Sequence, residues 1–297
     1  MKILLLYFTG TYNTAFISQM IADQFIEAGH EAVLFSIESK TEKPKLGDFD
    51  LIGLGYPIHA FNEPKIFRQF VRQLPLTPQQ KVFIYKDSGE VYRYNDASSR
   101  YTKGILKKKK VLLMGEYHFV MPYNIIFRTP DAFVKESLIE DEKAVAVMIH
   151  NLRKGIVRIK KPRLVDTALS LLCLVEHSCG YWNSFFMKVD KKKCLKCYQC
   201  LATCPQGNIV LKNGRIRFGH RCLTCMRCAY FCPTDAIKMG FLNSWKVNGA
   251  YRFQEIKNNP EIPAKLDRAK AKKFYRSFTE YFEKIDEEYD AIAQKGL

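Results

Sequence analysis

Two short cysteine runs constrain this sequence of 297 residues more tightly than any other feature. The first run, CLKCYQCLATCP, begins at Cys194, and the second, CLTCMRCAYFCP, begins at Cys222. Both follow the spacing C-x2-C-x2-C-x3-C-P at every position. This close spacing lets three thiolates converge on one face of a cubane cluster, and the fourth cysteine then starts a short helix that leads away. Because the whole pattern occurs twice in tandem, the sequence predicts two [4Fe–4S] clusters.

In this arrangement the fourth cysteine of each run serves the other cluster. The ligands expected are Cys194, Cys197, Cys200 and Cys232 for one cluster, and Cys222, Cys225, Cys228 and Cys204 for the other. Two competing interpretations stay open. Disulfide bonds would need an oxidising compartment, for which the sequence shows no targeting signal. Structural zinc uses paired C-x2-C knuckles, without a third cysteine in the triplet and a following C-P.

The positive charge of the chain gathers around these cysteines. The formal net charge is +17, and residues 188–240 hold 11 Lys and Arg residues against 2 Asp and Glu residues. A cubane with four thiolates carries about −2 when oxidised, so part of this excess balances the clusters. The remainder predicts a basic face that docks an acidic redox protein. No run interleaves aromatic and basic residues as single-strand nucleic-acid grooves do, so no nucleic-acid partner is expected.

The cysteine region resembles the bacterial two-cluster ferredoxins over residues 188–240. Ile209 and Ile237, five residues after the fourth cysteines, stand where such modules pack an apolar residue over the cluster. The resemblance implies a small α+β domain that transfers electrons one at a time.

The first 160 residues alternate apolar strands with amphipathic helices. Strands are expected over the ranges 2–8, 31–37, 51–56, 81–85 and 110–114, and helices over 15–28, 64–74, 97–107 and 131–154. Continuous apolar strands joined by helices are typical of a parallel sheet buried on both faces. The sequence thus predicts a doubly wound α/β fold of five strands, with a ligand crevice at the carboxyl ends of the strands.

The loop after the first strand is rich in hydroxyl and Gly residues and runs into a helix N-terminus, an arrangement that favours phosphate. It lacks the GxGxxG of dinucleotide sites and the Gly-Lys-Ser/Thr of P-loops. It resembles the FMN-phosphate loop of the flavodoxins, except that Tyr12 stands where a small residue is usual. The cofactor residues that this resemblance implies are Thr9, Gly10, Thr11, Tyr12, Asn13 and Thr14.

Two further loops extend the resemblance to the flavodoxins. The loop after the third strand carries aromatic residues that would stack on the flavin ring, and the loop after the fourth would meet the ring edge through its backbone. The residues implied are Tyr56, Pro57, Ile58, His59 and Phe61 in the first loop, and Ser88 and Gly89 in the second. Capping of the sheet end is the alternative role for these aromatics.

The chain as a whole resembles the flavodoxin–ferredoxin fusions called "ferrodoxin" proteins, mostly from anaerobes, over residues 1–255. The phrases FNEPK, KDSGE, NDASS and MPYNIIFR carry this resemblance. It implies an electron-transfer protein with two clusters and FMN as the one- to two-electron converter. An FMN-free docking domain that presents a ferredoxin, and a flavin reductase of small molecules, are the alternatives.

The expected domains are a flavodoxin-like unit over 1–160, a helical connector over 161–187, the two-cluster unit over 188–240, and a linker with a C-terminal helix over 241–297. The apolar helix at 164–175 is expected to pack between the domains, with contact at a membrane surface as the alternative. A stripe of Phe, Tyr and Ile along 265–293 predicts a helix that packs on its own chain. No segment is long and apolar enough for stable membrane insertion, so a cytoplasmic protein is expected; the oligomeric state is not indicated.

Overall fold

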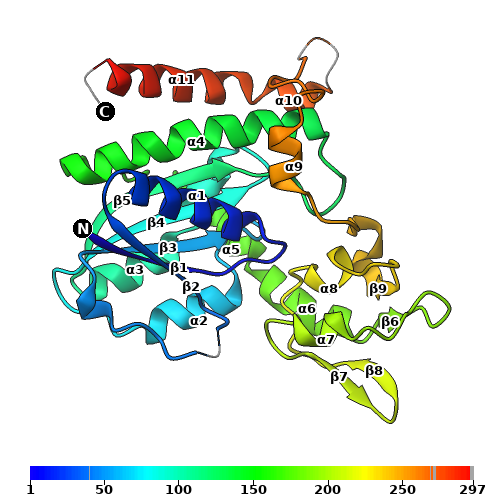
Figure 1. Ribbon diagram of the computed structural model, residues 1–297. Helices are drawn as coiled ribbons and strands as arrows, with labels where there is room; N and C mark the ends of the chain where they lie inside the picture. Colours follow the sequence, from blue (N-terminus) through cyan, green and yellow to red (C-terminus); the bar gives the residue numbers. More distant parts are fainter. Residues whose placement is uncertain (40, 268, 270–271, 295–297) are drawn as a thin grey trace.

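A computed structural model describes residues 1–39, 41–267, 269 and 272–294 (Figure 1). The chain forms a layered α/β body, with a smaller lobe built around the cysteine runs at one end of the sheet. None of the helices in these ranges has the length and apolar character needed to cross a bilayer.

The body contains a sheet of five strands that are all parallel, in the order β2-β1-β3-β4-β5. This is the flavodoxin-like strand order, with the reversal between β1 and β3. The predicted fold class is therefore confirmed, although the last two strands run further than expected. The strands are β1 (Lys2–Tyr7), β2 (Glu31–Ser36), β3 (Leu51–Pro57), β4 (Lys81–Ser88) and β5 (Leu112–Val120).

Helices cover both faces of this sheet (Figure 1). The helices α1 (Asn13–Glu27) and α4 (Asp131–Lys154) bury one face, and α2 (Lys65–Gln73) and α3 (Arg100–Lys108) bury the other. Because apolar residues point to both sides of the central strands, Ile3, Leu4 and Leu5 are all fully buried. Short 3-10 helices, η1 (Leu46–Asp48) and η2 (Arg93–Ala97), complete the connections.

The cysteine lobe is a small α+β unit of two hairpin-like pairs and two short helices. Strand β6 (Met187–Val189) pairs antiparallel with β9 (Ile237–Met239), and β7 (Ile209–Lys212) pairs with β8 (Arg215–Phe218). The helices α7 (Gln199–Ala202) and α8 (Arg227–Tyr230) each contain the third cysteine of a run and end before the fourth, so the prediction that the fourth cysteine starts a short helix is wrong. Ile209 and Ile237 are buried, as the apolar positions after the cysteine runs predict.

The connector between the two parts is helical from Leu164 to Ser184, as α5 (Leu164–Leu172), η3 (Cys173–Val175) and α6 (Glu176–Ser184). The sequence predicted that its apolar residues would be buried between the domains, and that prediction is wrong. Leu164, Leu172 and Val175 face solvent, while Asp166 and Ser170 face the protein. The reason is that hydrogen bonds hold the polar side inward: the Ser170 hydroxyl donates to Asn62 Oδ1 at 2.8 Å.

The tail returns to the body after η4 (Gly240–Trp245) and α9 (Phe253–Asn258). The single predicted helix over 265–293 is two helices, α10 (Lys273–Arg276) and α11 (Thr279–Ala293), separated at Ser277–Phe278. Positions 268, 270 and 271 of that prediction lie outside the described residues. Phe278 and Phe282 are buried, and the Phe278 ring lies 4.8 Å from that of Phe133 on α4. The predicted packing of the aromatic stripe on its own chain is confirmed.

Two glycines offer a matched test of this packing. A Cβ placed on Gly55 of β3 would lie 2.2 Å from the Tyr85 ring, whereas one placed on Gly104 of α3 would meet no atom within 4 Å. We expect Gly55→Ala to destabilise the fold by about 1–3 kcal/mol through overpacking. We expect Gly104→Ala to stabilise it by about 0.5–1 kcal/mol, because Ala is the better helix former. Urea unfolding of both variants measures the difference; equal midpoints would contradict the packing described for β3.

Candidate metal centre

The two cysteine loops share one backbone conformation. Lys196 and Tyr198 in the first loop take φ values of 55° and 57°, and Thr224 and Met226 in the second take 54° and 58°. Left-handed residues at alternate positions are uncommon outside glycine and curl the chain tightly. The curl turns backbone N–H groups and thiols of each loop toward a common centre.

Backbone N–H groups donate to sulfur at equivalent places in the two loops. The N–H groups of Lys196 and Thr224 each lie 3.4 Å from the Sγ of the first cysteine of their run. The N–H groups of Asn208 and Ala236 lie 3.3 Å and 3.2 Å from the Sγ of the fourth. Such bonds stabilise thiolates and tune the potential of a bound cluster.

The fourth cysteine of the second run joins the first three of the other run. One cavity is lined by Cys194, Cys197, Cys200 and Cys232 together with Cys228. Burial raises the pKa of Cys200 to about 11, and the nearby thiols of Cys197, Cys194 and Cys232 add to the rise. This is the set of neighbours that the crossed arrangement of the two runs predicts.

The second set gathers around Cys225 and Cys228. Burial raises the pKa of Cys225 to about 12, with Cys222 and Cys204 contributing to the rise. Burial raises the pKa of Cys228 as well, and again Cys204 of the first run is among its neighbours. Buried thiols ionise readily only when a metal centre stabilises the thiolate. The donor sets therefore fit cationic centres.

The competing zinc interpretation depends on several ligands around one ion. Within the described ranges, no three Cys, His, Asp or Glu side chains lie close enough together to hold one metal ion. A tetrahedral zinc site would need four ligands within about 2.0–2.3 Å of the ion.

The two loops differ in their surroundings although they share a backbone. Around the first loop, Leu195 and Cys197 are exposed to solvent. In the second loop the equivalent Leu223 and Cys225 pack against the apolar core between the sheet and α2 and α3. One cysteine loop therefore faces solvent, and the other faces the flavodoxin-like body.

Arg227, between the last two cysteines of the second triplet, fixes that contact. Its buried guanidinium donates to the backbone carbonyls of Thr9 and Gly10, the latter at 2.9 Å from Nε. Both of its terminal nitrogens also donate to the Glu38 carboxylate at 2.6 Å. A Cβ placed on Gly10 would lie 3.2 Å from the Cys225 carbonyl oxygen. The loop after β1 and the second cysteine loop thus form one interlocked contact.

In the loop after β1, Tyr12 stands where the flavodoxins have a small residue. The backbone at this position still makes the turn that a phosphate site needs. Tyr12 adopts φ 74°, so its Cβ does not prevent the left-handed turn. Its ring points away from the loop and lies edge-on to Phe231 at 5.0 Å. The N-terminus of α1 directly follows, with no side chain capping it.

The side chains of this loop are largely engaged with the protein. The Thr14 hydroxyl donates to Asp87 at 2.5 Å, the Asn13 amide donates to the Pro122 carbonyl at 2.9 Å, and Asn124 donates to the Thr11 hydroxyl. Two buried atoms of the loop, Thr9 Oγ1 and Asn13 Oδ1, have no hydrogen-bond partner among the residues that the structure describes. The phosphate end of a flavin site is thus partly retained.

The residues that were predicted to contact the flavin ring pack against other parts of the chain. Tyr56 is fully buried in the core, 4.8 Å from the Phe67 ring, so it cannot stack on a cofactor as the sequence predicted. The Phe61 ring contacts Tyr94 at 5.7 Å, which joins the two loops that would enclose a flavin ring. The Tyr123 ring covers Gly89, since a Cβ there would lie 2.5 Å from it.

The other predicted residues of the ring end are held in place by neighbours. Ile58 N–H donates to the Asp87 carbonyl, and Pro57 ends β3. His59 Nδ1 lies 4.0 Å from Glu176 of the connector. The Ser88 hydroxyl pairs with His118 Nε2 at 2.8 Å and accepts from the Asn95 amide at 3.1 Å.

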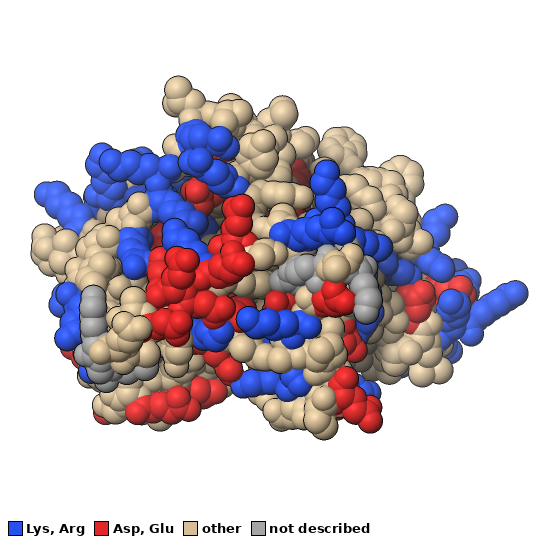
Figure 2. Space-filling view, turned by 90° about the horizontal axis from the view of Figure 1, so that it is seen from above, with Lys and Arg blue, Asp and Glu red and all other residues tan. Residues whose placement is uncertain are grey.

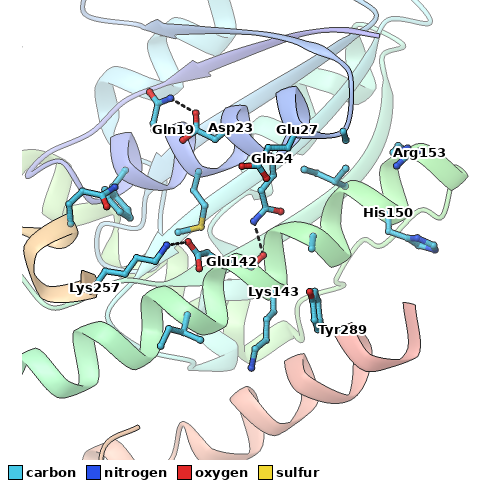
Figure 3. Close-up of a pocket in the computed structure, with 17 residues that line it drawn as sticks. Gln19, Asp23, Gln24, Glu27, Glu142, Lys143, His150, Arg153, Lys257 and Tyr289 are labelled. Atoms are coloured by element: carbon cyan, nitrogen blue, oxygen red, sulfur yellow. Dashed lines mark hydrogen bonds and ion pairs between the residues drawn. The ribbon is translucent and has the colours of Figure 1, made fainter. Parts of the chain in front are cut away.

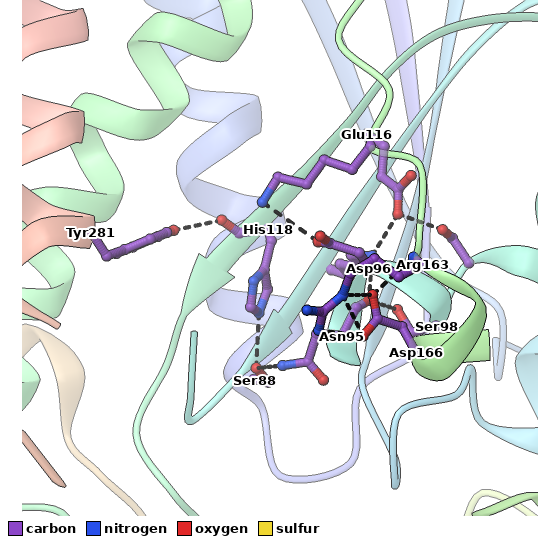
Figure 4. Close-up of polar contacts among 12 residues, drawn as sticks. Ser88, Asn95, Asp96, Ser98, Glu116, His118, Arg163, Asp166 and Tyr281 are labelled. Carbon is purple, nitrogen blue, oxygen red and sulfur yellow. Dashed lines mark hydrogen bonds and ion pairs between the residues drawn. The ribbon is translucent and has the colours of Figure 1, made fainter. Parts of the chain in front are cut away.

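A buried polar network beside these loops was not foreseen from the sequence. Figure 4 shows Glu116 and His118 of β5 with Ser88 of β4 and the connector residues Arg163 and Asp166. The Lys86 ammonium, on β4, donates to Glu116 at 2.5 Å, and the two lysines Lys86 and Lys103 hold the pKa of that carboxyl low. In the sequence, Lys86 is a single charged residue beside an apolar run. That one position is the sequence signal for the buried network.

A separate cavity of about 830 Å³ is lined by residues of α1, α4, α9 and α11 (Figure 3). Some of its polar side chains are paired: Gln19 donates to Asp23 along α1 at 2.7 Å, and Lys257 of α9 donates to Glu142 of α4. None of the sequence-predicted site residues lines it.

Residues 186–233 match the family model described as a 4Fe-4S dicluster domain. No curated protein matches the chain. Similar solved structures include a short-chain flavodoxin associated with a non-canonical PDU bacterial microcompartment (16% identity, TM-score 0.39) and the flavodoxin of Streptococcus pneumoniae TIGR4 (12%, 0.39). Each alignment covers 52% of this chain and 99% of that structure. The dicluster match and the flavodoxin-like strand order together support a role in electron transfer.

The Arg227 contact gives a testable prediction with a matched control. Arg221 and Arg227 each directly precede a cysteine, but Arg221 is exposed. We expect Arg227→Gln to lower the free energy of unfolding by about 3 kcal/mol, because it leaves Glu38 and two loop carbonyls without their buried partner. Arg221→Gln should change it by less than about 0.5 kcal/mol. Anaerobic urea unfolding compares the two variants. Equal unfolding midpoints would contradict the role of Arg227 in the contact between the two loops.

Proposed function

We propose that this chain is an electron carrier with two [4Fe–4S] clusters. Cys194, Cys197, Cys200 and Cys232 would bind one, and Cys222, Cys225, Cys228 and Cys204 the other. The observation that carries the proposal is the shared cavity in which Cys232 faces the first three cysteines of the other run. Thiolates from both runs would then tie the lobe together through its cofactors.

The first cluster would be the point of exchange with partners. Its loop is exposed at Leu195 and Lys196, whereas the second loop is packed against the body. The basic residues Lys191, Lys192 and Lys193 directly precede this loop and are exposed. Figure 2 shows that Lys and Arg lie mainly toward the edges of the α11 face, with acidic residues gathered nearer its middle. An acidic redox protein is the partner that such a basic loop would attract.

The flavodoxin-like body would serve as the frame on which the second cluster docks. FMN fits the phosphate end of the site only in part, and the ring end does not fit it. The Phe61 ring, predicted to stack on a flavin, packs against Tyr94 instead, and Tyr123 covers Gly89. We therefore derive no step through a flavin, and we assign the interlock of Arg227 with Thr9 and Gly10 to docking.

The second candidate function is a flavo-iron–sulfur carrier that binds FMN. The unpaired buried atoms Thr9 Oγ1 and Asn13 Oδ1, next to the uncapped N-terminus of α1, favour it, because phosphate oxygens and hydroxyls are natural partners there. In that case FMN would exchange electrons in ones and twos. It requires Tyr123 and the loop with Phe61 to move aside.

Cofactor content after anaerobic purification separates these candidates. We expect about eight iron and about eight sulfide per chain, corresponding to two cubanes, with no flavin extracted even after incubation with FMN. Cys232→Ala should reduce the iron to about four. One FMN per chain would favour the second candidate, and a zinc-containing, iron-free protein would contradict the proposal.

The docking of an acidic partner predicts a salt-dependent rate. The reduction of the chain by a small acidic flavodoxin should slow as salt screens the basic loop. Lys192→Glu should slow it by about tenfold at low salt. Lys81→Glu, at the opposite end of the sheet, is the control and should leave the rate unchanged. Stopped-flow absorbance measures the reduction rates of both variants. A rate that changes neither with salt nor with Lys192→Glu would contradict an acidic partner.

A further inference from the structure

The connector formed by α5, η3 and α6 is an amphipathic helical segment whose apolar side faces outward. Its inward side is polar: Asp166, Ser170 and Asn183 are fully buried. Asn62 donates to the Ser170 carbonyl at 2.8 Å, and the Asn183 amide oxygen accepts from the Phe241 N–H at 3.0 Å. These bonds fix the rotation of the segment, so its apolar side cannot turn inward.

The outward side is a continuous apolar stripe. The exposed large apolar residues named below are separated by steps of eight, three, seven, three and one residues, so most of them lie on one side of the helical path. Their exposed fractions run from 53% to 91% in the set Leu164, Leu172, Val175, Trp182, Phe185 and Phe186. An exposed apolar patch of this extent marks an interaction site. We call these six residues the outward stripe.

Charge around the outward stripe is positive. The segment contains two acidic residues: Asp166 is buried against Arg163, and Glu176 accepts a hydrogen bond from Thr224 of the second cysteine loop. Exposed basic residues lie at both ends, namely Lys160, Lys161 and Arg163 before the segment and Lys188, Lys191, Lys192 and Lys193 after it.

This arrangement disfavours a second copy of the chain as the occupant. A two-fold interface places the same patch against itself. Either orientation of two such segments would bring a basic end against a basic end, because both ends are positive. Like charges at the edge of an apolar interface oppose association.

We propose that the outward stripe adsorbs to the surface of an anionic lipid bilayer. Segments that lie in the plane of a membrane carry Leu, Phe and Trp on one side and Lys and Arg close by, and they bind more strongly to anionic lipids. Trp182, Phe185 and Phe186 would enter the headgroup boundary, while the flanking lysines meet lipid phosphates. The segment lies between the sheet and the cysteine lobe (Figure 1), so adsorption would hold the lobe beside the membrane.

Vesicle co-sedimentation of the anaerobic full chain tests this. Extruded vesicles of phosphatidylcholine alone are compared with vesicles in which about a third of the lipid is phosphatidylglycerol. We expect the chain to bind the anionic vesicles at least about tenfold more tightly, and to be released by salt. Intrinsic fluorescence should shift to shorter wavelength on binding as Trp182 leaves water.

Leu172→Glu and Ile26→Glu form the matched pair of variants, because both residues are exposed and Ile26 lies on α1, away from the stripe. Leu172→Glu should weaken binding at least tenfold, and Ile26→Glu should leave it unchanged. Trp182→Glu is a second stripe variant; unchanged cluster absorbance shows that each variant is folded. Absence of binding to anionic vesicles, equal binding by Leu172→Glu, or a Leu172-dependent dimer in sedimentation velocity would overturn the proposal.

Discussion

The buried guanidinium of Arg227 is the contact on which the relation between the two parts of the chain depends. It lies one residue before Cys228, and it reaches carbonyls of the loop after β1 and the carboxylate of Glu38 after β2. A buried charge without its partners is costly, so the cysteine lobe and the sheet are held in one arrangement. The same contact lies at the carboxyl ends of β1 and β2, beside the β1/β3 reversal at which a doubly wound sheet binds ligands.

This contact also makes two similar cysteine loops unequal. Gln199 stands in the first run where Arg227 stands in the second, and the first loop is left at the surface. Two clusters held by these loops would differ in solvent exposure, which is one of the factors that set cluster potentials. In the proposed electron carrier, this asymmetry would provide an outer centre for exchange and an inner centre against the body.

Much of this could be predicted from the sequence, because spacing and periodicity report on local structure. The cysteine intervals indicated the loops, and the apolar runs indicated the strands of a parallel sheet. The buried contact of Arg227 was not foreseen. This arginine was expected among the basic residues of the docking face, and its partners Glu38 and Gly10 are distant in sequence. The burial of Tyr56 was not predicted, because it lies at the end of β3. The sequence alone does not show that a helix packs over this position.

The connector was misjudged for a different reason. An apolar helix is normally buried, and the sequence pattern of α5 is the same whichever way the helix is turned. The rotation is decided by polar partners elsewhere, such as Asn62 for Ser170. These partners belong to the tertiary structure, so periodicity within the segment cannot reveal them.

The central claim is that each cluster takes three ligands from one cysteine run and the fourth from the other. Anomalous diffraction at the iron edge, from crystals grown without oxygen, tests it most directly. The account predicts two four-iron peaks, one enclosed by Cys194, Cys197, Cys200 and Cys232, and one by Cys222, Cys225, Cys228 and Cys204. Peaks enclosed by the four cysteines of a single run, or single-ion zinc peaks in their place, would contradict it.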